Sequence, residues 1–190
     1  MVFAGIDYSL TSPSITIYNN DQGFEWKNCQ TYFLSDIKKT HGIHENIVGT
    51  PMPLYTSDQE RYHEIASWAF DIVYKHSVDL AFIEDYSYGS TGRVFHIAEN
   101  AGVLKQQMWE SGVTFETIPP TVIKKHATGK GNASKVMMEE AFTKETLVDL
   151  RSILNLTEKQ NNPISDIIDS YYIMKTGYCS WLCPAQDTTQ

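Results

Sequence analysis

The fold is decided by the stretch VFAGIDYS at residues 2–9, in which small and apolar residues lead up to one carboxylate, Asp7. A continuous apolar run of this kind predicts a buried central strand. Asp7 then ends that strand inside the fold, where a charge needs a cation, a hydrogen-bond donor or a metal as its partner. Hydroxyl residues follow at positions 9, 11, 12 and 14. The alternative is an aspartate that only begins a turn, and further carboxylates at the same place would favour a functional site.

Strand-like and helix-like segments alternate after this first strand. Residues 15–33 predict a β-hairpin around the turn-rich NNDQG, whereas residues 40–57 have no clear period and are expected to form a loop. A second buried strand at 78–84 ends in Glu84, and a short strand at 113–118 stops before two prolines. Helical spacing and capping residues predict helices at 58–75, 94–110, 133–147 and 163–176. The order predicts an α/β fold with a mixed five-stranded sheet flanked by helices.

The composition suits one globular domain over residues 1–190, with 184–190 as a frayed tail. The chain is 42% hydrophobic, and no stretch approaches the roughly 18 apolar residues of a membrane helix. The N-terminus lacks the basic segment and long apolar stretch of a secretory signal. The three cysteines have no zinc-like spacing, so we expect free thiols in a reducing cytoplasm.

Three further carboxylates can reach the position of Asp7. Glu84 also ends a buried strand, and ligands gather outside the carboxyl ends of parallel strands. Asp166 and Asp169 are three residues apart in the last predicted helix and share one face. Four converging carboxylates would repel each other unless cations lay between them, and such hard oxygen ligands suit Mg²⁺ or Mn²⁺. The alternative for the last two is an exposed helix face, where acids near the N-terminus are favourable.

The charge is unevenly distributed along the chain. The net charge of -8 argues, taken alone, against a nucleic-acid partner, because a basic footprint is the usual sign of one. Residues 124–135, however, contain no acid and carry Lys124, Lys125, Lys130 and Lys135. This segment could follow a phosphate backbone, helped by helix N-terminal amides near Ala133. A solvated basic loop is the simpler alternative.

Taken in this order, the motifs resemble RuvC-type Holliday-junction resolvases, within the RNase H and retroviral-integrase superfamily. The resemblance runs from Gly5 to about Ile173. Its three acidic motifs are similar to GID at 5–7, IE at 83–84 and SDIIDS at 165–170, and its lysine–glycine segment resembles PPTVIKK at 119–125 with GKGNASK at 129–135. The resemblance implies an RNase H-like fold. The pattern after Asp7 and the inserted residues 40–57 indicate a divergent, bacteriophage-like member.

The resemblance also implies roles for individual residues. Two Mg²⁺ or Mn²⁺ ions are expected to be held by the four catalytic carboxylates Asp7, Glu84, Asp166 and Asp169. Lys124 and Lys135 are expected to support catalysis. Further DNA contacts are expected of Lys125, Lys130 and Arg93. An aromatic side chain that wedges into the junction centre would be Tyr86 or Tyr88. The family acts as a homodimer that nicks two strands of a four-way junction symmetrically.

The resulting hypothesis is a metal-dependent, structure-selective endodeoxyribonuclease that resolves Holliday junctions and other branched DNA by a two-metal mechanism. It would act in the cytoplasm, which is the host's if the chain comes from a phage. One alternative is a resolvase-like module that binds junctions without cutting them. Another is a terminase-like or RNase H-like nuclease with the same chemistry. An actin-like or sugar-kinase-like ATPase also begins with Gly-x-Asp, but such proteins usually need two lobes, for which 190 residues leave no room.

Overall fold

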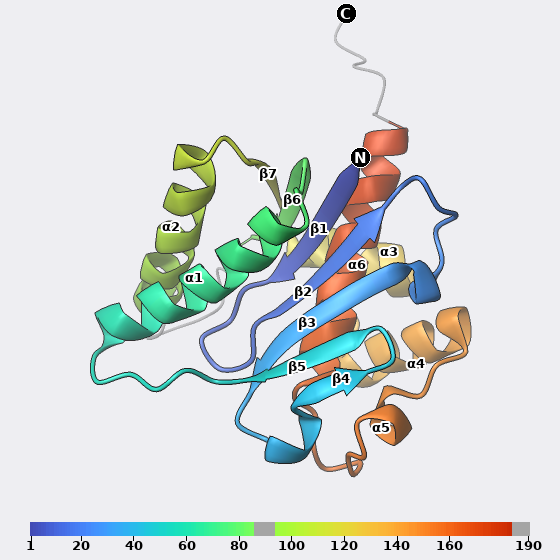
Figure 1. Cartoon of the computed structure of the whole chain (residues 1–190). Helices are drawn as coiled ribbons and strands as arrows, with labels where there is room; N and C mark the ends of the chain where they lie inside the picture. Colours follow the sequence, from blue (N-terminus) through green and yellow to red (C-terminus); the bar gives the residue numbers. More distant parts are fainter. Residues whose placement is uncertain (86–93, 184–190) are drawn as a thin grey trace, which may run out of the picture.

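A mixed sheet forms the centre of the molecule (Figure 1). The computed structural model describes residues 1–85 and 94–183, and within them seven strands have the order β4-β5-β3-β2-β1-β6-β7. Their bounds are β1 Val2–Asp7, β2 Ser14–Asn19, β3 Cys29–Ser35, β4 Gly42–His44, β5 Ile47–Pro51, β6 Leu80–Glu84 and β7 Thr114–Ile118. The apolar run does form a central strand, antiparallel to β2 and parallel to β6. The predicted α/β fold with a mixed sheet is confirmed.

The sheet has two strands more than the expected five, because only part of the expected loop at 40–57 is irregular and residues 42–51 are mostly extended. They form the hairpin of β4 and β5, and β5 adds to the edge of β3 in parallel. Glu45 turns the hairpin with a φ of 55°, and Ile47 is fully buried. A strand of five residues that contains Gly49 and ends in Pro51 has too short an alternation to be recognised from its sequence.

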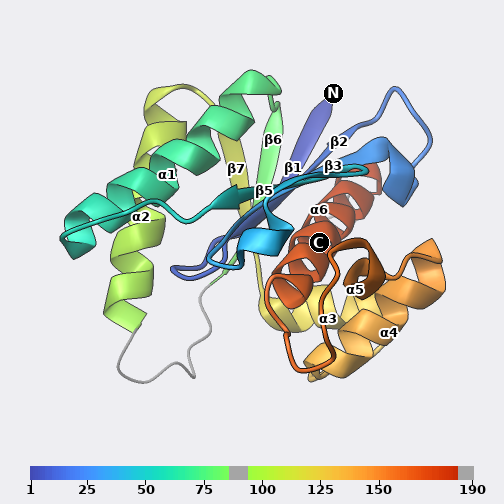
Figure 2. The ribbon, with the colours of Figure 1, turned by 60° about the horizontal axis from the view of Figure 1, so that its bottom comes forward.

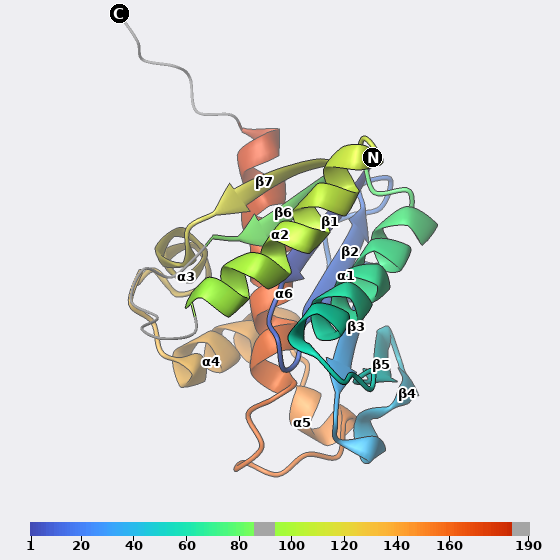
Figure 3. The ribbon, with the colours of Figure 1, turned by 90° about the vertical axis from the view of Figure 1, so that its left-hand side faces the viewer.

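Helices cover both faces of the sheet. One face carries α1 (Asp58–Lys75) and α2 (Val94–Glu110), and the opposite face carries α6 (Ile164–Leu182) with the short helices that surround it (Figures 2 and 3). Those short helices are α3 (Pro120–Thr128), α4 (Lys135–Thr146) and α5 (Leu150–Ile153). Side chains of β1 alternate between two cores, with Ala4 and Ile6 facing α1 and α2 and Phe3 facing α6.

Two glycines allow α6 to pack closely on the sheet. A Cβ atom on Gly5 would lie 2.3 Å from the backbone nitrogen of Met174, and one on Gly177 would lie 2.2 Å from the ring of Phe82. Glycine at these two positions therefore lets the helix backbone rest directly on β1 and β6. Beside this contact, buried Ser170 Oγ is 2.9 Å from Thr16 Oγ1 and 3.0 Å from Ser14 Oγ.

The last helix is longer than predicted. It continues past Thr176 to Leu182, because its final turns pack aromatic rings on the beginning of β1. The ring of Phe3 lies 5.1 Å from that of Tyr178 and 5.0 Å from that of Trp181. Of the helices in the described ranges, none combines the length and apolar character that crossing a bilayer requires.

Candidate active site

The parallel pairing of β1 and β6 brings two predicted carboxylates together. Ile6 is opposite Ile83 in the register, so Asp7 and Glu84 occupy the next step on adjacent strands. Side chains alternate along a strand, and Gly5 and Phe82 lie against α6. Asp7 and Glu84 are two residues further along the same strands and therefore point to the α6 side of the sheet.

The beginning of α6 supplies the other two carboxylates. Asp166 lies in its first turn and Asp169 follows one turn later. Asp166 is only 7% exposed, and Ser12 Oγ donates a 2.7 Å hydrogen bond to its Oδ2 atom. Because Ser170, which follows Asp169, is bonded to Ser14 and Thr16 on β2, the register of the acidic turn on the sheet is fixed.

The pKa values show that the four carboxylates interact with one another. Burial raises the pKa of Asp7 well above its usual range, and the charges of Asp166, Asp169 and Glu84 raise it further. Burial, with the charges of Glu84 and Asp166, raises the pKa of Asp169 to about 7. For Asp166, burial outweighs the Ser12 hydrogen bond and the charge of Lys135, so its pKa rises to about 6. Burial also raises the pKa of Glu84, against the charge of Lys124.

Two of the four predicted lysines lie near enough to the acids to lower their pKa values. The positive charge of Lys135 lowers the pKa of Asp7, Asp166 and Asp169, and that of Lys124 lowers the pKa of Glu84 and Asp169. Lys124 comes from α3 and Lys135 is the first residue of α4, whose N-cap Ser134 accepts a hydrogen bond from the Met137 amide. The side chains of Lys125 and Lys130 are exposed. Tyr86, Tyr88 and Arg93 lie outside the described residues, so their roles stay predictions.

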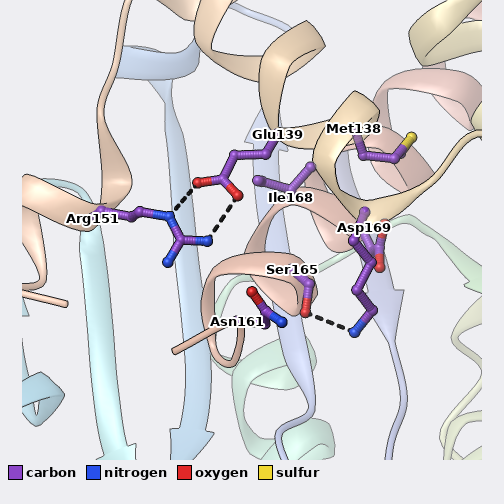
Figure 4. Close-up of a pocket in the computed structure, with 8 residues that line it drawn as sticks. Met138, Glu139, Arg151, Asn161, Ser165, Ile168 and Asp169 are labelled. Carbon is purple, nitrogen blue, oxygen red and sulfur yellow. Dashed lines mark hydrogen bonds and ion pairs between the residues drawn. The ribbon is translucent and has the colours of Figure 1, made fainter. Parts of the chain in front are cut away.

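Figure 4 shows a small cavity between α4 and α6, near Glu139, Ser165 and Asp169. Its volume is about 10 Å³, and Lys135 also lines it. Lys135 Nζ donates a 3.1 Å hydrogen bond to Ser165 Oγ. On the other side of the cavity, Arg151 forms a bidentate pair with Glu139, with N–O distances of 2.6 and 2.8 Å. A cavity of this volume holds no more than about one water molecule, so the substrate must approach from outside.

The residues that sequence reasoning missed are polar partners of the acids. Ser12 belonged to a hydroxyl run noted after Asp7, but its contact with Asp166 joins residues 154 positions apart. Asn162, which donates to Ser12 Oγ at 2.9 Å, was not singled out at all. Its position four residues before Asp166 was the one available indication, because residues just ahead of a helix often bond its first turn.

The donor set fits a divalent metal by its chemistry. Carboxylates at one place raise each other's pKa, and a bound cation relieves such repulsion and favours the ionised form. Oxygen ligands of this kind are those that Mg²⁺ and Mn²⁺ prefer. Within residues 1–85 and 94–183, no three acidic, histidine or cysteine side chains are already close enough to enclose an ion. The fit therefore rests on the ligand type and the charge at this edge of the sheet.

Comparison with known proteins identifies the fold. No family model matches the sequence, and a search of curated proteins finds no match. Among solved structures, RuvC of Thermus thermophilus matches with a TM-score of 0.61 and 19% identity over 96% of both chains. The same protein in complex with a Holliday junction substrate gives 0.59 and 19% identity over 93% of this chain and 92% of that one. The yeast mitochondrial Holliday junction resolvase gives 0.52 and 14% identity over 94% and 78%. The chain thus has the fold of these resolvases.

Proposed function

We propose that this chain is a metal-dependent, structure-selective endodeoxyribonuclease, a single nuclease domain that resolves Holliday junctions and other branched DNA. The observation that carries the proposal is the set of Asp7, Glu84, Asp166 and Asp169, whose charges interact at the carboxyl ends of two parallel strands. Lys124 and Lys135 border this set. The fold shared with solved resolvases supports the same chemistry by analogy.

The four carboxylates would hold Mg²⁺ or Mn²⁺, with two ions expected per site. When bound, such ions neutralise the charge that develops on the phosphate and supply an activated water. The chain's own contribution is to hold the acids in place: β1 and β6 fix Asp7 and Glu84, and α6 fixes Asp166 and Asp169. Lys124 and Lys135 would orient the scissile phosphate and stabilise its added negative charge. Lys125 and Lys130, both exposed, would contact the backbone further along the DNA.

Paired symmetric nicks need two active sites, and we propose that two copies of the chain supply them through α2. Phe95 and Trp109 are 76% and 73% exposed, and their spacing of 14 residues puts them on one face of the helix. An open hollow of about 510 Å³ lies between α1 and the same stretch of α2, lined by Gln59, Tyr62, Glu99, Gly102, Val103, Gln106 and Gln107. Exposed aromatic residues on a helix that also borders a hollow are typical of a surface that another protein covers.

The cytoplasm is the proposed site of action. All three cysteines are free thiols, and Cys29 is buried, which accords with a reducing compartment.

A nicking assay with four substrates tests the proposed function. Purified protein with Mg²⁺ should nick a four-way junction at symmetric positions, cut flaps more slowly, and leave linear duplex and RNA–DNA hybrid intact. Asp7→Asn should abolish nicking while junction binding remains. If Asp7→Asn cut as fast as the wild type, the site would be wrong. If the wild type bound junctions but never nicked them in Mg²⁺ or Mn²⁺, the non-cleaving module would be the better description.

A further inference from the structure

A continuous series of hydrogen bonds connects Lys135 to Asp166 through three uncharged side chains. Lys135 Nζ lies 3.1 Å from Ser165 Oγ, and Ser165 Oγ lies 3.1 Å from Asn162 Oδ1. Asn162 Nδ2 lies 2.9 Å from Ser12 Oγ, which in turn lies 2.7 Å from Asp166 Oδ2. The series begins on α4, passes through the first turn of α6 and the residue before Pro163, and crosses to the turn between β1 and β2.

Every bond in this series has the same direction. The ammonium group of Lys135 can only donate, and the carboxylate of Asp166 accepts. Ser165 then donates to the amide oxygen of Asn162, and the amide nitrogen of Asn162 donates to Ser12, which donates to Asp166. A series with aligned donors polarises each of its members, so each bond strengthens the next.

Residues that are not members of the series also hold it in place. Glu139 lies one helical turn after Lys135 on α4 and binds Arg151 through two bonds. Arg151 Nη1 donates at 2.8 Å to the carbonyl oxygen of Thr157 and at 2.9 Å to that of Gln160. The face of α4 that presents Lys135 thus also anchors the loop that leads to Asn162, so the first and the middle members of the series are positioned by the same helix.

We propose that Ser12 and Asn162 are positioning residues that orient the carboxylate of Asp166 and couple it to Lys135. This inference rests on the proposed function, because it assigns Asp166 to the metal and Lys135 to the phosphate. The hydroxyl of Ser12 holds one oxygen of this buried carboxylate through the 2.7 Å hydrogen bond and so restricts its rotation. Partners of metal ligands that act in this way typically change metal affinity by about 10–100-fold when they are removed.

The test compares Ser12→Ala, Asn162→Ala and the double variant with Ser12→Thr, which keeps a hydroxyl. Thr11→Ala is the matched control, because Thr11 is an exposed neighbour in the same turn. Two quantities are measured: the Mg²⁺ concentration that gives half-maximal junction nicking, and the shift in melting temperature that Mg²⁺ causes without DNA. Asn162 is exposed, so its variant keeps the test valid if Ser12→Ala does not fold.

Ser12→Ala and Asn162→Ala should each raise the required Mg²⁺ concentration about tenfold and reduce the melting shift. Ser12→Thr should restore most of both, and Thr11→Ala should match the wild type. Because the two residues act in series, the double variant should be no worse than the worse single variant. Additive losses, or variants with wild-type Mg²⁺ dependence in both measurements, would overturn the inference. A wild type that nicks no junction would instead overturn the proposed function, and the melting shifts would still test whether the series orients a metal ligand.

Discussion

Gly5 and Met174 are in such close contact that a methyl group on the glycine would lie 2.3 Å from the backbone nitrogen of the methionine. This contact places α6 directly on β1, two residues before Asp7 and one to two helical turns after Asp166 and Asp169. It therefore sets the distance between the acids of the sheet and the acids of the helix.

Gly5→Ala should be severely destabilising, because backbone atoms cannot move aside as a flexible side chain can. We expect a loss of about 3 kcal/mol or more in the free energy of unfolding, within the range for overpacked cores, measured by urea denaturation. Gly23→Ala is the matched control, because a Cβ there meets nothing within 4 Å. Equal stability of the two variants would contradict the close packing.

Lys135→Ala should affect the chemical step more than DNA binding. Removing a group that stabilises developing charge typically lowers the rate about 100-fold, so the single-turnover nicking rate at saturating protein should fall by about that factor. Lys125→Ala should instead weaken junction binding and lower the number of counterions released on binding by about one. Its nicking rate at saturating protein should stay at the wild-type value. Lys75→Ala, on the exposed end of α1, is the neutral control. The reverse pattern for Lys135 and Lys125 would exclude the assigned roles.

The metal-free protein should lose stability as the pH rises from about 5 to 8. The pKa values of Asp166 and Asp169 are raised to about 6 and about 7, whereas an unfolded aspartate titrates near about 3.9. The folded state therefore binds more protons than the unfolded state in this window, so the free energy of unfolding falls with increasing pH. Melting temperatures in EDTA measure this fall, and Mg²⁺ should offset it most at pH 8.

A comparison with Asp169→Asn isolates the acidic site from other titrating groups. Burial lowers the pKa of His76 and of His126, so these two residues oppose the trend at the acidic end of the window. They are present in both proteins, and their effect cancels in the difference. Asp169→Asn should lose less stability between pH 6 and 8 than the wild type. A larger loss in the variant would show that Asp169 is not held at a raised pKa.

The pair between Arg151 and Glu139 should contribute more to stability than an exposed ion pair. Its side chains are 18% and 30% exposed, and Arg151 also holds two backbone carbonyls of the loop before α6. Arg151→Ala should cost about 1–3 kcal/mol, since hydrogen bonds to a charged group are lost. Lys27→Ala breaks a pair with side chains 75% and 59% exposed and should cost less than about 1 kcal/mol. Urea denaturation of both variants checks the difference.

Trp109→Glu should separate the two proposed copies and uncouple the paired nicks. A charge on the face that carries Phe95 and Trp109 would have to be buried in the interface, which is unfavourable. We expect a monomer by sedimentation and singly nicked junctions in place of resolved duplexes. Tyr74→Glu is the control, because Tyr74 is 72% exposed on α1 and should leave the mass unchanged. A wild type that is already monomeric would exclude the proposed interface.

The sequence predicted the parts of the molecule that have strong local patterns. The apolar runs before Asp7 and Glu84 indicate buried parallel strands, and strand ends meet at one edge by general rules of sheet topology, so these two acids could be placed together. The i, i+3 spacing of Asp166 and Asp169 needs only helix geometry. The helix at 58–75 follows from its helical spacing and from a cap at Ser57 or Asp58, and in the structure Ser57 Oγ accepts from the Glu60 amide.

What the sequence could not predict depends on contacts between distant segments. Ser12 and Asp166 are 154 residues apart, and no local rule assigns one hydroxyl of a run to a particular carboxylate. β5 is a strand because β3 offers it an edge, and not because of its own propensity. The extension of α6 to Leu182 depends on Phe3, which lies beneath the rings of Tyr178 and Trp181.

The site has a protected part, on the central strands β1 and β6, and an adjustable part, at the surface. Backbone amides of β1 and β6 are bonded on both sides and should be among the slowest in the chain to exchange with deuterium. The lysines come instead from α3 and α4, at the surface. In the proposed enzyme, substitutions on α3 and α4 would therefore alter which DNA shape is bound without moving the four acids.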